Sequence, residues 1–574
     1  MSDNAAAVPA AEISGLGISY RAAGRRVDVV RDVSFSLPIG RTLGLVGESG
    51  SGKSTTARTL LGHLRDGSRI DAGSIRVLGE DVFALPPERL RQLRGGSVGL
   101  VAQNAGHALT PSMTVGDQVA ETLAGHGLPH GTDRLAELFD LVRLPSPRAL
   151  LRRYPHELSG GQQQRAAIAM AVSTDPRLLV LDEPTTALDV ITQAAVLSLI
   201  NELQERLGMA VLIVSHDLGV VSAVADEVLV LKDGTEVESG PTDQVLGSPR
   251  TDYTRVLLEA APRVHGSAVS RDEVAEAPLV SCRGLQIRYL GAERRAVNGV
   301  DLTLRRGETL AVVGESGSGK STIATALAGL VALEGGSAEL VSADGARLDL
   351  SKPPHRRPVA ARRAMQLIFQ NADLALNPRR SVGDAIGRAL RVFDRAHGGT
   401  SIRRDVERLL SEVGLTPAMA DRVPAQLSGG QRQRVGIARA LAADPELLIA
   451  DEVTTALDVS VQAEVLELLE GLRSSRGLSC LFISHDLAVV RSVADRVMVM
   501  RSGVVVESAP TDVLFDDPRH PYTKALMDAV VEPGHHDLPS SDADTIVPVS
   551  DPDSHLRDLG NGHLVRNDEG VAVA

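Results

Sequence analysis

The stretch GESGSGKST occurs twice in this chain, at Gly47–Thr55 and at Gly314–Thr322, so its two copies lie 267 residues apart. Three further motifs are duplicated in the same order: LSGGQ from Leu158 and Leu427, TTALDV from Thr185 and Thr454, and SHDL from Ser215 and Ser484. Each of these pairs is separated by 269 residues. Such a period far exceeds the roughly 20–50 residues of stacked repeats. The sequence therefore predicts two copies of one domain.

This period also sets the expected domain boundaries. The first domain is expected over residues 1–262 and the second over residues 278–533. The segment between them, 263–277, is small and charged and lacks apolar periodicity, so it is expected to be a linker. Residues 534–574 are rich in Asp, Ser, His and Gly, and they are expected to form an acidic, mobile C-terminal tail.

Short apolar runs precede the motifs that carry chemistry. Thr42–Val46 and Thr309–Val313 each lead into a Gly-rich loop and then a helical stretch, whereas Leu178–Leu181 and Leu447–Ala450 end at acidic pairs. Polar groups at the ends of buried strands predict an α/β fold with a mostly parallel core sheet and a site at its carboxyl edge. Earlier segments such as Gly15–Tyr20 alternate with period two, which predicts an additional antiparallel piece.

Composition excludes several classes of protein. The 574 residues carry 60 basic and 73 acidic side chains, for a formal net charge of −13, and seven Phe, five Tyr and no Trp. An acidic chain with few aromatics lacks the features of a nucleic-acid binder. Cys282 and Cys480 are isolated, which excludes a disulfide framework and a cysteine-ligated metal site. With no apolar run near 18–20 residues and no signal-peptide features, the chain is expected to be soluble and cytoplasmic.

Both copies of GESGSGKST fit the phosphate-binding pattern GxxxxGK[ST]. Glycines let backbone N–H groups turn toward phosphates, and the following helix presents its positive end. In this pattern the Lys reaches the β/γ-phosphates and the Ser hydroxyl binds Mg²⁺. The expected nucleotide-binding residues are Gly47, Ser49, Gly50, Gly52, Lys53, Ser54 and Thr55, and Gly314, Ser316, Gly317, Gly319, Lys320, Ser321 and Thr322. A Gly/Ser-rich turn would explain one match, but two matches at duplicated positions predict nucleotide binding.

An acidic pair follows a buried strand in each half. Asp182 and Asp451 are expected to hold Mg²⁺. Glu183 and Glu452 are placed to polarise an attacking water as general bases, a role worth roughly 10²–10⁴ in rate. An isolated acidic pair could equally be a solvated loop or a helix cap. Downstream of a phosphate loop, the catalytic interpretation is favoured.

Together these residues resemble the ATP-binding cassette (ABC) ATPases. LSGGQ matches the family signature, Gln103 and Gln370 match its Q-loop, and His216 and His485 match its switch histidine, with Asp189 and Asp458 at its D-loop. Tyr20 and Tyr289 lie where an adenine-stacking aromatic is expected, although half-buried strand aromatics are an equal alternative. The resemblance implies two tandem P-loop NTPase domains. Each would have a mostly parallel core sheet, an antiparallel β subdomain and a helical signature subdomain.

The same resemblance implies composite ATP sites and head-to-tail pairing of the halves. One site would combine Lys53, Gln103, Asp182, Glu183 and His216 with Ser428 and Gly430. The other would combine Lys320, Gln370, Asp451, Glu452 and His485 with Ser159 and Gly161. The implied metal ligands are Ser54, Gln103 and Asp182, and Ser321, Gln370 and Asp451. Val453 departs from the first half, which has Pro184 at this position, but it removes no catalytic side chain.

Three segments resemble the dipeptide/oligopeptide importer subfamily: Tyr154–Arg165, TTALDV and Asp516–Leu526. This resemblance implies an ATPase working with two permease subunits and an extracytoplasmic substrate-binding protein, at the cytoplasmic face of the membrane and without nucleic acid. Peptides are the first expected cargo, and nickel or a glutathione-like solute is the alternative. Many members carry a cysteine-rich C-terminal element proposed to hold an iron–sulfur cluster. The tail here has no cysteine, so no cluster is expected.

Other ABC classes fit less well. A permease-free tandem ABC translation factor would have a long basic linker, whereas residues 263–277 are short and mixed in charge and the chain is acidic. The HPYT element argues against an exporter by resemblance, and a DNA-repair ATPase would need long insertions and zinc cysteines. An importer ATPase is the function that the sequence predicts.

Overall fold

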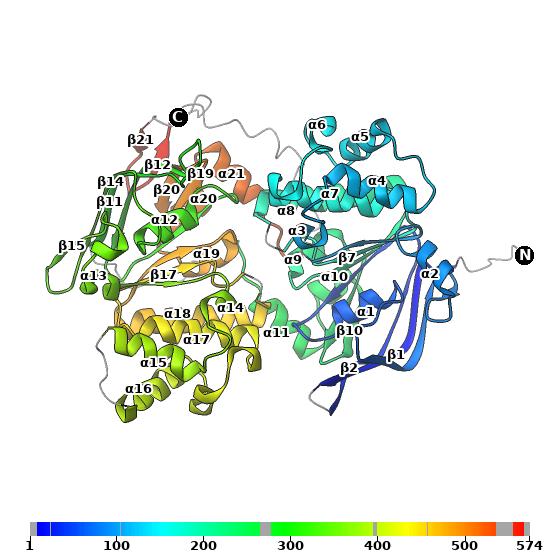
Figure 1. Cartoon of the computed structure of the whole chain (residues 1–574), viewed down its shortest axis with the longest axis horizontal. Coiled ribbons are helices and arrows are strands. Elements are labelled where there is room, and N and C mark those ends of the chain that lie inside the picture. Colours follow the sequence, from blue (N-terminus) through cyan, green and yellow to red (C-terminus); the bar gives the residue numbers. More distant parts are fainter. Residues whose placement is uncertain are drawn as a thin grey trace, which may run out of the picture.

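The computed structural model describes residues 8–22, 25–103, 105–186, 188–264, 277–393, 399–455, 457–534 and 555–567. These residues form two halves of similar architecture that lie side by side, the first coloured blue to green-cyan and the second green to red (Figure 1). Each half contains one antiparallel sheet, one mostly parallel sheet and a group of helices. The predicted fold class is therefore confirmed.

In the first half, the antiparallel sheet has the strand order β2-β1-β4-β5 and the core sheet the order β10-β9-β3-β8-β7-β6. The core strands run parallel except for β10, which is antiparallel to β9. The strands are β1 (Ala11–Ala22), β2 (Arg25–Leu37), β3 (Thr42–Val46), β4 (Ser68–Val77), β5 (Glu80–Asp81), β6 (Val98–Val101), β7 (Leu178–Asp182), β8 (Ala210–Val214), β9 (Glu227–Lys232) and β10 (Thr235–Pro241). Every residue of β3, β7 and β8 is buried, as expected for parallel strands that are covered on both faces.

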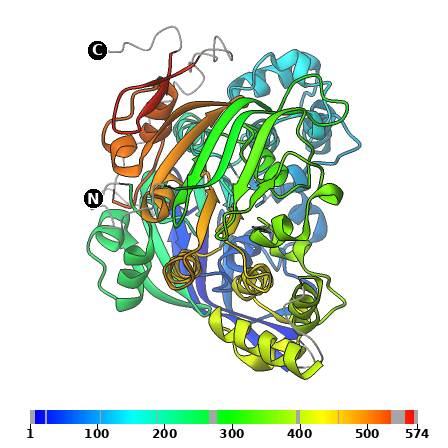
Figure 2. The ribbon, with the colours of Figure 1, turned by 90° about the vertical axis from the view of Figure 1, so that its left-hand side faces the viewer.

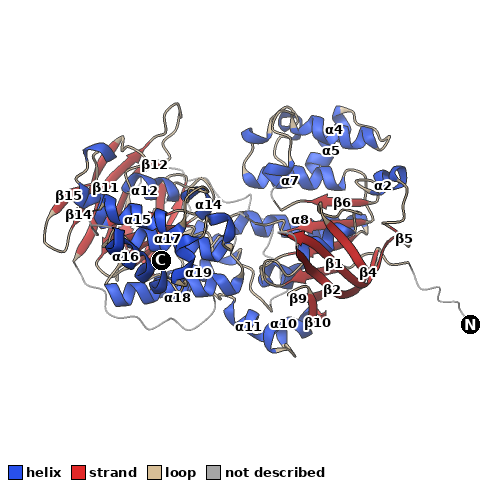
Figure 3. Ribbon diagram, turned by 60° about the horizontal axis from the view of Figure 1, so that its bottom comes forward, coloured by secondary structure: helices blue, strands red, loops and turns tan. Residues whose placement is uncertain are grey.

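The helices of the first half fall into two groups. Figure 3 shows α4 and α5 away from the strands, whereas α7 lies beside β6 and contacts it. The helices are α1 (Lys53–Thr59), α2 (Pro87–Leu93), α3 (Ala105–Ala108), α4 (Val115–Gly125), α5 (Thr132–Leu141), α6 (Pro147–Leu150), α7 (Gly160–Val172), α8 (Val190–Leu207), α9 (Leu218–Val224), α10 (Thr242–Gly247) and α11 (Asp252–Ala260). A 3-10 turn over Pro155–Glu157 leads into α7.

The second half repeats this plan, with the orders β12-β11-β14-β15 and β16-β17-β18-β13-β19-β20-β22-β21. Its strands are β11 (Pro278–Ile287), β12 (Val297–Arg305), β13 (Thr309–Val313), β14 (Gly335–Val341), β15 (Arg347–Asp349), β16 (Met365–Ile368), β17 (Leu447–Asp451), β18 (Ser479–Ile483), β19 (Arg496–Arg501), β20 (Val504–Pro510), β21 (Leu556–Asp558) and β22 (Leu564–Arg566). In the larger sheet, β16, β17, β18, β13 and β19 pair in parallel, in that order. Beyond them, β20, β22 and β21 pair antiparallel, with β20 next to β19.

The helices of the second half are α12 (Lys320–Leu327), α13 (Val359–Ala364), α14 (Ala372–Ala375), α15 (Val382–Val392), α16 (Gly399–Glu412), α17 (Gly429–Leu441), α18 (Val459–Arg476), α19 (Leu487–Val493), α20 (Thr511–Asp516) and α21 (Pro521–Asp528). Short 3-10 turns lie at Pro354–Arg356, Pro417–Asp421 and Pro424–Gln426. Figure 2 looks onto this half, with green strands in its upper part and yellow-green helices at the bottom.

Residues 555–567 differ from the expected mobile tail. They form the hairpin β21–β22, and β22 pairs with β20 at Glu507 and Ser508. The buried His563 ring lies 2.7 Å from the Glu507 carboxylate, and Arg566 Nε donates to the Val505 carbonyl at 2.7 Å. The polar composition of the whole segment obscured this short pairing strand. Residues 265–276 of the expected linker and 535–554 and 568–574 of the tail lie outside the described residues, and the domain boundaries stay predictions.

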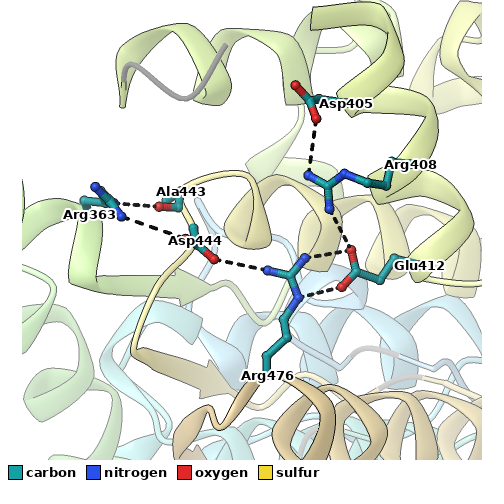
Figure 4. Close-up of polar contacts among 7 residues, drawn as sticks. All are labelled: Arg363, Asp405, Arg408, Glu412, Ala443, Asp444 and Arg476. Atoms are coloured by element: carbon teal, nitrogen blue, oxygen red, sulfur yellow. Dashed lines mark hydrogen bonds and ion pairs between the residues drawn. The ribbon is translucent and has the colours of Figure 1, made fainter. Parts of the chain in front are cut away.

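A charge cluster joins the helical and core parts of the second half (Figure 4). Arg476, the last residue of α18, donates to both oxygens of Glu412 at 2.5 and 2.7 Å and to Asp444 at 3.4 Å. Two parallel bonds from a guanidinium to one carboxylate fix both distance and orientation. The repeat places Leu207 at the position of Arg476, so the first half has no guanidinium here.

The helical parts of the two halves lie at opposite ends of the molecule (Figure 1). Figure 1 shows α4–α7 at the top of the first half and α15 and α16 at the bottom of the second. The segments after the last helices connect the halves, because Val264 N donates to Glu532 Oε1 at 2.5 Å and Gly534 N donates to Ser222 Oγ at 2.9 Å. In addition, α11 contacts α18 and α21 contacts α8. Among the helices of the described ranges, none has the length and apolar character needed to span a bilayer.

Candidate nucleotide-binding and catalytic sites

Each phosphate loop connects a core strand to a short helix, β3 to α1 and β13 to α12. The first loop needs glycine at Gly47 (φ 140°), where a Cβ would lie 2.0 Å from the Leu231 carbonyl oxygen. It also needs glycine at Gly52 (φ 93°), where a Cβ would lie 2.8 Å from the Val29 carbonyl oxygen. A side chain at either position would push the loop off the sheet. Gly47 and Gly52 are therefore required by close backbone approach.

Both loop lysines fold back over their own loops. Lys53 Nζ donates to the carbonyls of Gly47 at 2.6 Å and Glu48 at 2.8 Å, and Lys320 Nζ makes the same two bonds to Gly314 and Glu315 at 2.8 Å. Burial lowers the pKa of both lysines, although neighbouring carboxylates oppose this shift. These bonds hold each ammonium at the loop, where it can meet an anion.

The predicted metal ligands meet at the carboxyl ends of β7 and β17. Ser54 Oγ donates to Asp182 Oδ1 at 2.7 Å, and Ser321 Oγ donates to Asp451 Oδ1 at 2.8 Å. A hydroxyl beside a carboxylate is an all-oxygen donor set, which is what Mg²⁺ takes in proteins. The residues therefore fit the expected metal. Burial is the main cause that raises the pKa of Asp451, and the nearby Glu452 adds to it.

The predicted general base of the first half is held by three side chains. Glu183 accepts from Gln103 Nε2 at 2.8 Å and Thr186 Oγ1 at 3.0 Å, and His216 Nδ1 lies 3.4 Å away. Its backbone has φ 53°, an unfavourable value for a residue with a Cβ, and its N–H donates to the Val214 carbonyl at 2.9 Å. A strained backbone conformation of this kind persists only where the surrounding contacts hold it in place, and it is often found at functional sites.

The second half repeats this arrangement. Glu452 has φ 47°, accepts from Gln370 Nε2 at 2.6 Å and lies 3.6 Å from His485 Nδ1. The structure thus brings both predicted glutamine and histidine pairs to the predicted bases.

Each histidine and its glutamate form a coupled pair. Burial alone would raise the pKa of Glu183, but the bond and charge of His216, followed by Thr186 and Gln103, lower it to about 2. Burial also opposes protonation of His216, yet the Glu183 carboxylate raises the pKa of this histidine above its ordinary value. The pKa of Glu452 is lowered and that of His485 raised for the same reasons. The carboxylates are therefore ionised at neutral pH.

The phosphate loop of each half faces the D-loop aspartate of the other. Ser316 N donates to Asp189 Oδ2 at 3.4 Å, and the Ser49 backbone N–H donates to Asp458. Ser460 Oγ donates to Glu48 Oε1 at 3.2 Å. Residues from both halves also line a cavity of about 160 Å³, and both switch histidines belong to its lining. The lining includes Thr185, His216, Asp217, Thr454, His485 and Asp486. Both sites thus lie at the boundary between the halves.

The signature residues contact their own half. Ser159 and Ser428 cap α7 and α17, accepting from Gln162 N and Gln431 N at 3.3 Å each. The positions where Gly161 and Gly430 would carry a Cβ face Thr192 and Val461 of the same halves. No hydrogen bond or ion pair of the described residues joins these signature residues to the opposite loop. Their part in composite sites stays a prediction.

The two tyrosines expected to stack on adenine differ in position. Tyr20 lies within β1, opposite Val27 of β2 and Ser68 of β4. Tyr289 lies just beyond β11, and its hydroxyl is 3.1 Å from Thr322 Oγ1 of the second phosphate loop. The structure places Tyr289 at a loop residue, and the stacking role of both tyrosines stays a prediction.

Sequence reasoning missed two tyrosines that support the phosphate loops. Glu315 N donates to the hydroxyl of the fully buried Tyr522 at 2.8 Å, and Glu48 N donates to that of Tyr253 at 3.4 Å. Arg501 lies over the ring of Tyr522 at 4.9 Å, and Lys232 lies over that of Tyr253 at 4.5 Å. The duplicated DYT and PYT segments are the signal in the sequence that could have found them.

Comparison with known proteins agrees with this geometry. Residues 30–186 and 297–455 match the ABC transporter family, and residues 237–280 and 506–549 match the family described as "Oligopeptide/dipeptide transporter, C-terminal region". The glutathione import ATP-binding protein GsiA of Salmonella choleraesuis (strain SC-B67) is 41% identical over 567 residues, covering 91% of this chain and 90% of that protein. GsiA of Escherichia coli (strain K12) is 39% identical over 609 residues, covering 96% of each chain.

A solved structure also aligns along nearly the whole chain. The archaeal ribosome recycling factor aABCE1, in complex with the ribosomal stalk protein aP1, covers 96% of both chains with a TM-score of 0.59. At 20% identity this likeness shows the shared tandem fold alone. The family matches and the identities to the curated relatives decide the family, and they confirm the resemblance that the motifs indicated. The chain belongs to the ABC transporter family, as an ATP-binding protein with two ABC domains that is an ATPase coupled to transport.

Proposed function

We propose that this ATPase powers the import of small peptides. The observation that carries the proposal is the oligopeptide/dipeptide transporter region that follows the ABC match in both halves. The structure gives this region a contact with the nucleotide site, because its Tyr522 binds the backbone of the second phosphate loop. Glutathione, itself a tripeptide, is the second candidate, since relatives at 39–41% identity are named for its import. Nickel stays an alternative without a supporting observation here.

The catalytic groups support hydrolysis of ATP by water. The ionised Glu183 carboxylate, held by Gln103 and His216, accepts a proton from a water that attacks the γ-phosphorus, and the bond to the ADP oxygen breaks. Lys53, freed from its loop carbonyls, would balance phosphate charge. Mg²⁺ bound at Ser54 and Asp182 would supply further charge balance, with Gln103 as the third proposed ligand. Lys320, Ser321, Gln370, Asp451, Glu452 and His485 would serve in the second half.

Each ATP site would be completed by the signature helix of the other half. The contact of each phosphate loop with the opposite D-loop aspartate supports this arrangement. Ser428→Arg is expected to impair nucleotide trapping at the Lys53 site more than at the Lys320 site, because an arginine at the start of α17 would obstruct the phosphate of the opposite half. Site-resolved photolabelling with an azido-ATP measures the two sites separately. Equal or reversed loss would contradict the composite arrangement.

The remaining components would be two permease subunits and an extracytoplasmic binding protein, with the chain at the cytoplasmic face of the membrane. The test is purification of the tagged full chain from detergent-solubilised membranes, followed by reconstitution of the recovered complex in nanodiscs. Two membrane proteins are expected to co-purify. ATP turnover should then rise when a binding protein loaded with dipeptide or glutathione is added, and not with the unloaded protein.

Loading the binding protein with dipeptide, with glutathione or with Ni²⁺, in separate arms of this test, distinguishes the candidates. Stimulation by dipeptide favours the first candidate, stimulation by glutathione alone favours the second, and stimulation by Ni²⁺ alone would contradict both. If the tagged chain is recovered with ribosomes and without membrane proteins, the importer proposal is contradicted and a permease-free translation factor is favoured.

A further inference from the structure

The two phosphate-loop helices differ in one charged residue that contacts the metal-ligand carboxylate. Arg58 lies near the end of α1, and its Nε and Nη2 donate to Asp182 Oδ2 at 3.2 and 3.0 Å. The repeat places Thr325 of α12 at the same position. Thr325 Oγ1 donates to the carbonyls of Ser321 and Thr322 within its own helix. The arginine contact is therefore specific to the first site.

The two carboxylate oxygens of Asp182 have different hydrogen-bond partners. Oδ1 accepts from Ser54, the other proposed metal ligand, whereas Oδ2 accepts from the Arg58 guanidinium. The carboxylate is almost fully buried, at 1% exposed, and Arg58 is about half exposed. In the second site Asp451 accepts from Ser321, and among the described residues it has no ion-pair partner. Near the metal position, the first site thus holds one more positive charge.

This arginine is not needed to orient the carboxylate. Ser321 meets Asp451 at 2.8 Å without an arginine, nearly the distance at which Ser54 meets Asp182 beside one. The difference between the sites is therefore one of charge and not of ligand geometry. A fixed positive charge repels a divalent cation and also neutralises the carboxylate that would attract it. Both effects act in the same direction.

We propose that Arg58 makes the two sites unequal in metal affinity, so that the site holding Lys53 binds Mg²⁺ more weakly than the site holding Lys320. This inference rests on the proposed nucleotide sites and deepens them. A unit charge about 6 Å from a divalent cation, at the dielectric constant of water, changes its affinity roughly tenfold. When Mg²⁺ is limiting, the second site fills first. The metal supply then decides the order in which the two halves engage their nucleotides.

The test uses Mn²⁺ as the metal probe and electron paramagnetic resonance of the free ion as the readout, with the full chain and a non-hydrolysable ATP analogue. Two classes of Mn²⁺ site that differ roughly tenfold are expected. Arg58→Thr copies the residue of the other half and should give a single, tight class. Thr325→Arg should give a single, weak class, and Arg58→Lys should keep two classes because it keeps the charge.

Arg89→Thr is the matched control for loss of an arginine, since Arg89 forms an exposed pair with Glu80 away from the loops. It should leave both classes unchanged. Equal Mn²⁺ affinity of the two sites in the natural chain, or no effect of Arg58→Thr on these affinities, would overturn the inference while leaving nucleotide binding intact. Absence of any Mn²⁺ binding that depends on the nucleotide analogue would contradict the proposed ATP sites themselves, and the inference with them.

Discussion

Removing the hydroxyl of Tyr522 is expected to loosen the second phosphate loop. Tyr522→Phe keeps the ring, which is fully buried and lies beneath Arg501, but deletes the acceptor of the Glu315 backbone N–H. This bond is 2.8 Å long, and no water can replace the lost oxygen without space for it. A buried donor left without its partner costs about 1–3 kcal/mol. The equilibrium constant for local opening of the loop should therefore rise roughly 5- to 150-fold.

Tyr253→Phe is the matched control in the first half. Its bond to Glu48 N is 3.4 Å long and its ring is half-buried, so the N–H already has access to other partners. The cost of this substitution should be less than about 1 kcal/mol, since long hydrogen bonds contribute little.

Hydrogen exchange measured by mass spectrometry distinguishes the two loops within one sample. Peptides covering 314–322 should exchange faster in Tyr522→Phe, and those covering 47–55 should change little in Tyr253→Phe. The affinity of the second site for a nucleotide analogue should fall in parallel, because an open loop must close to bind phosphate. Equal effects of the two substitutions, or unchanged exchange at 314–322, would refute the argument that Tyr522 supports the loop.

Four further outcomes are expected. Glu183→Gln combined with Glu452→Gln should retain ATP binding and lower turnover by roughly 10²–10⁴, as measured by equilibrium binding and phosphate release; undiminished turnover would reject both bases. Glu183→Gln alone should lower the pKa of His216 from its raised value, because the carboxylate that raises it is removed while burial remains, and His485 should stay unchanged as an internal NMR control. In the natural chain the Glu183–His216 pair should contribute its full stabilisation of the folded state between about pH 4.5 and 6.5. This contribution should be lost as the pH falls toward about 2, and also as the pH rises through the raised pKa of His216. A free energy of unfolding that does not change with pH across both limits would contradict this. Arg476→Leu, which installs the residue of the first half, should lower the free energy of unfolding of the second half by about 1–3 kcal/mol in denaturant titration; an unchanged midpoint would show that the bidentate pair contributes nothing.

The phosphate loops and acidic pairs could be predicted because the residues of each motif are adjacent in sequence, whereas Gln103 and His216 were assigned by the resemblance to ABC ATPases. Strand β3 lies at the predicted Thr42–Val46, and the hydrogen bonds from Gln103 and the ion pair with His216 reach the predicted Glu183. Repetition of each motif made chance matches unlikely, and the buried strands determine where the motifs emerge. The strand hairpin over 555–567 was missed because three-residue strands carry little periodicity of their own.

Sequence alone determined the duplicated ABC fold and the groups proposed to bind phosphate and activate water, because the motifs that carry them are short, contiguous and repeated in the same order. Tertiary structure decided which groups meet across long stretches of chain. Arg58 reaches Asp182 across 124 residues, and Tyr522 reaches Glu315 across 207. The duplicated tyrosine segments mark Tyr522 in the sequence but do not name its partner, and Arg58 has no duplicated counterpart, since each contact depends on how a helix packs against another part of the chain. Side-chain contacts of this kind make the two otherwise similar halves electrostatically unequal.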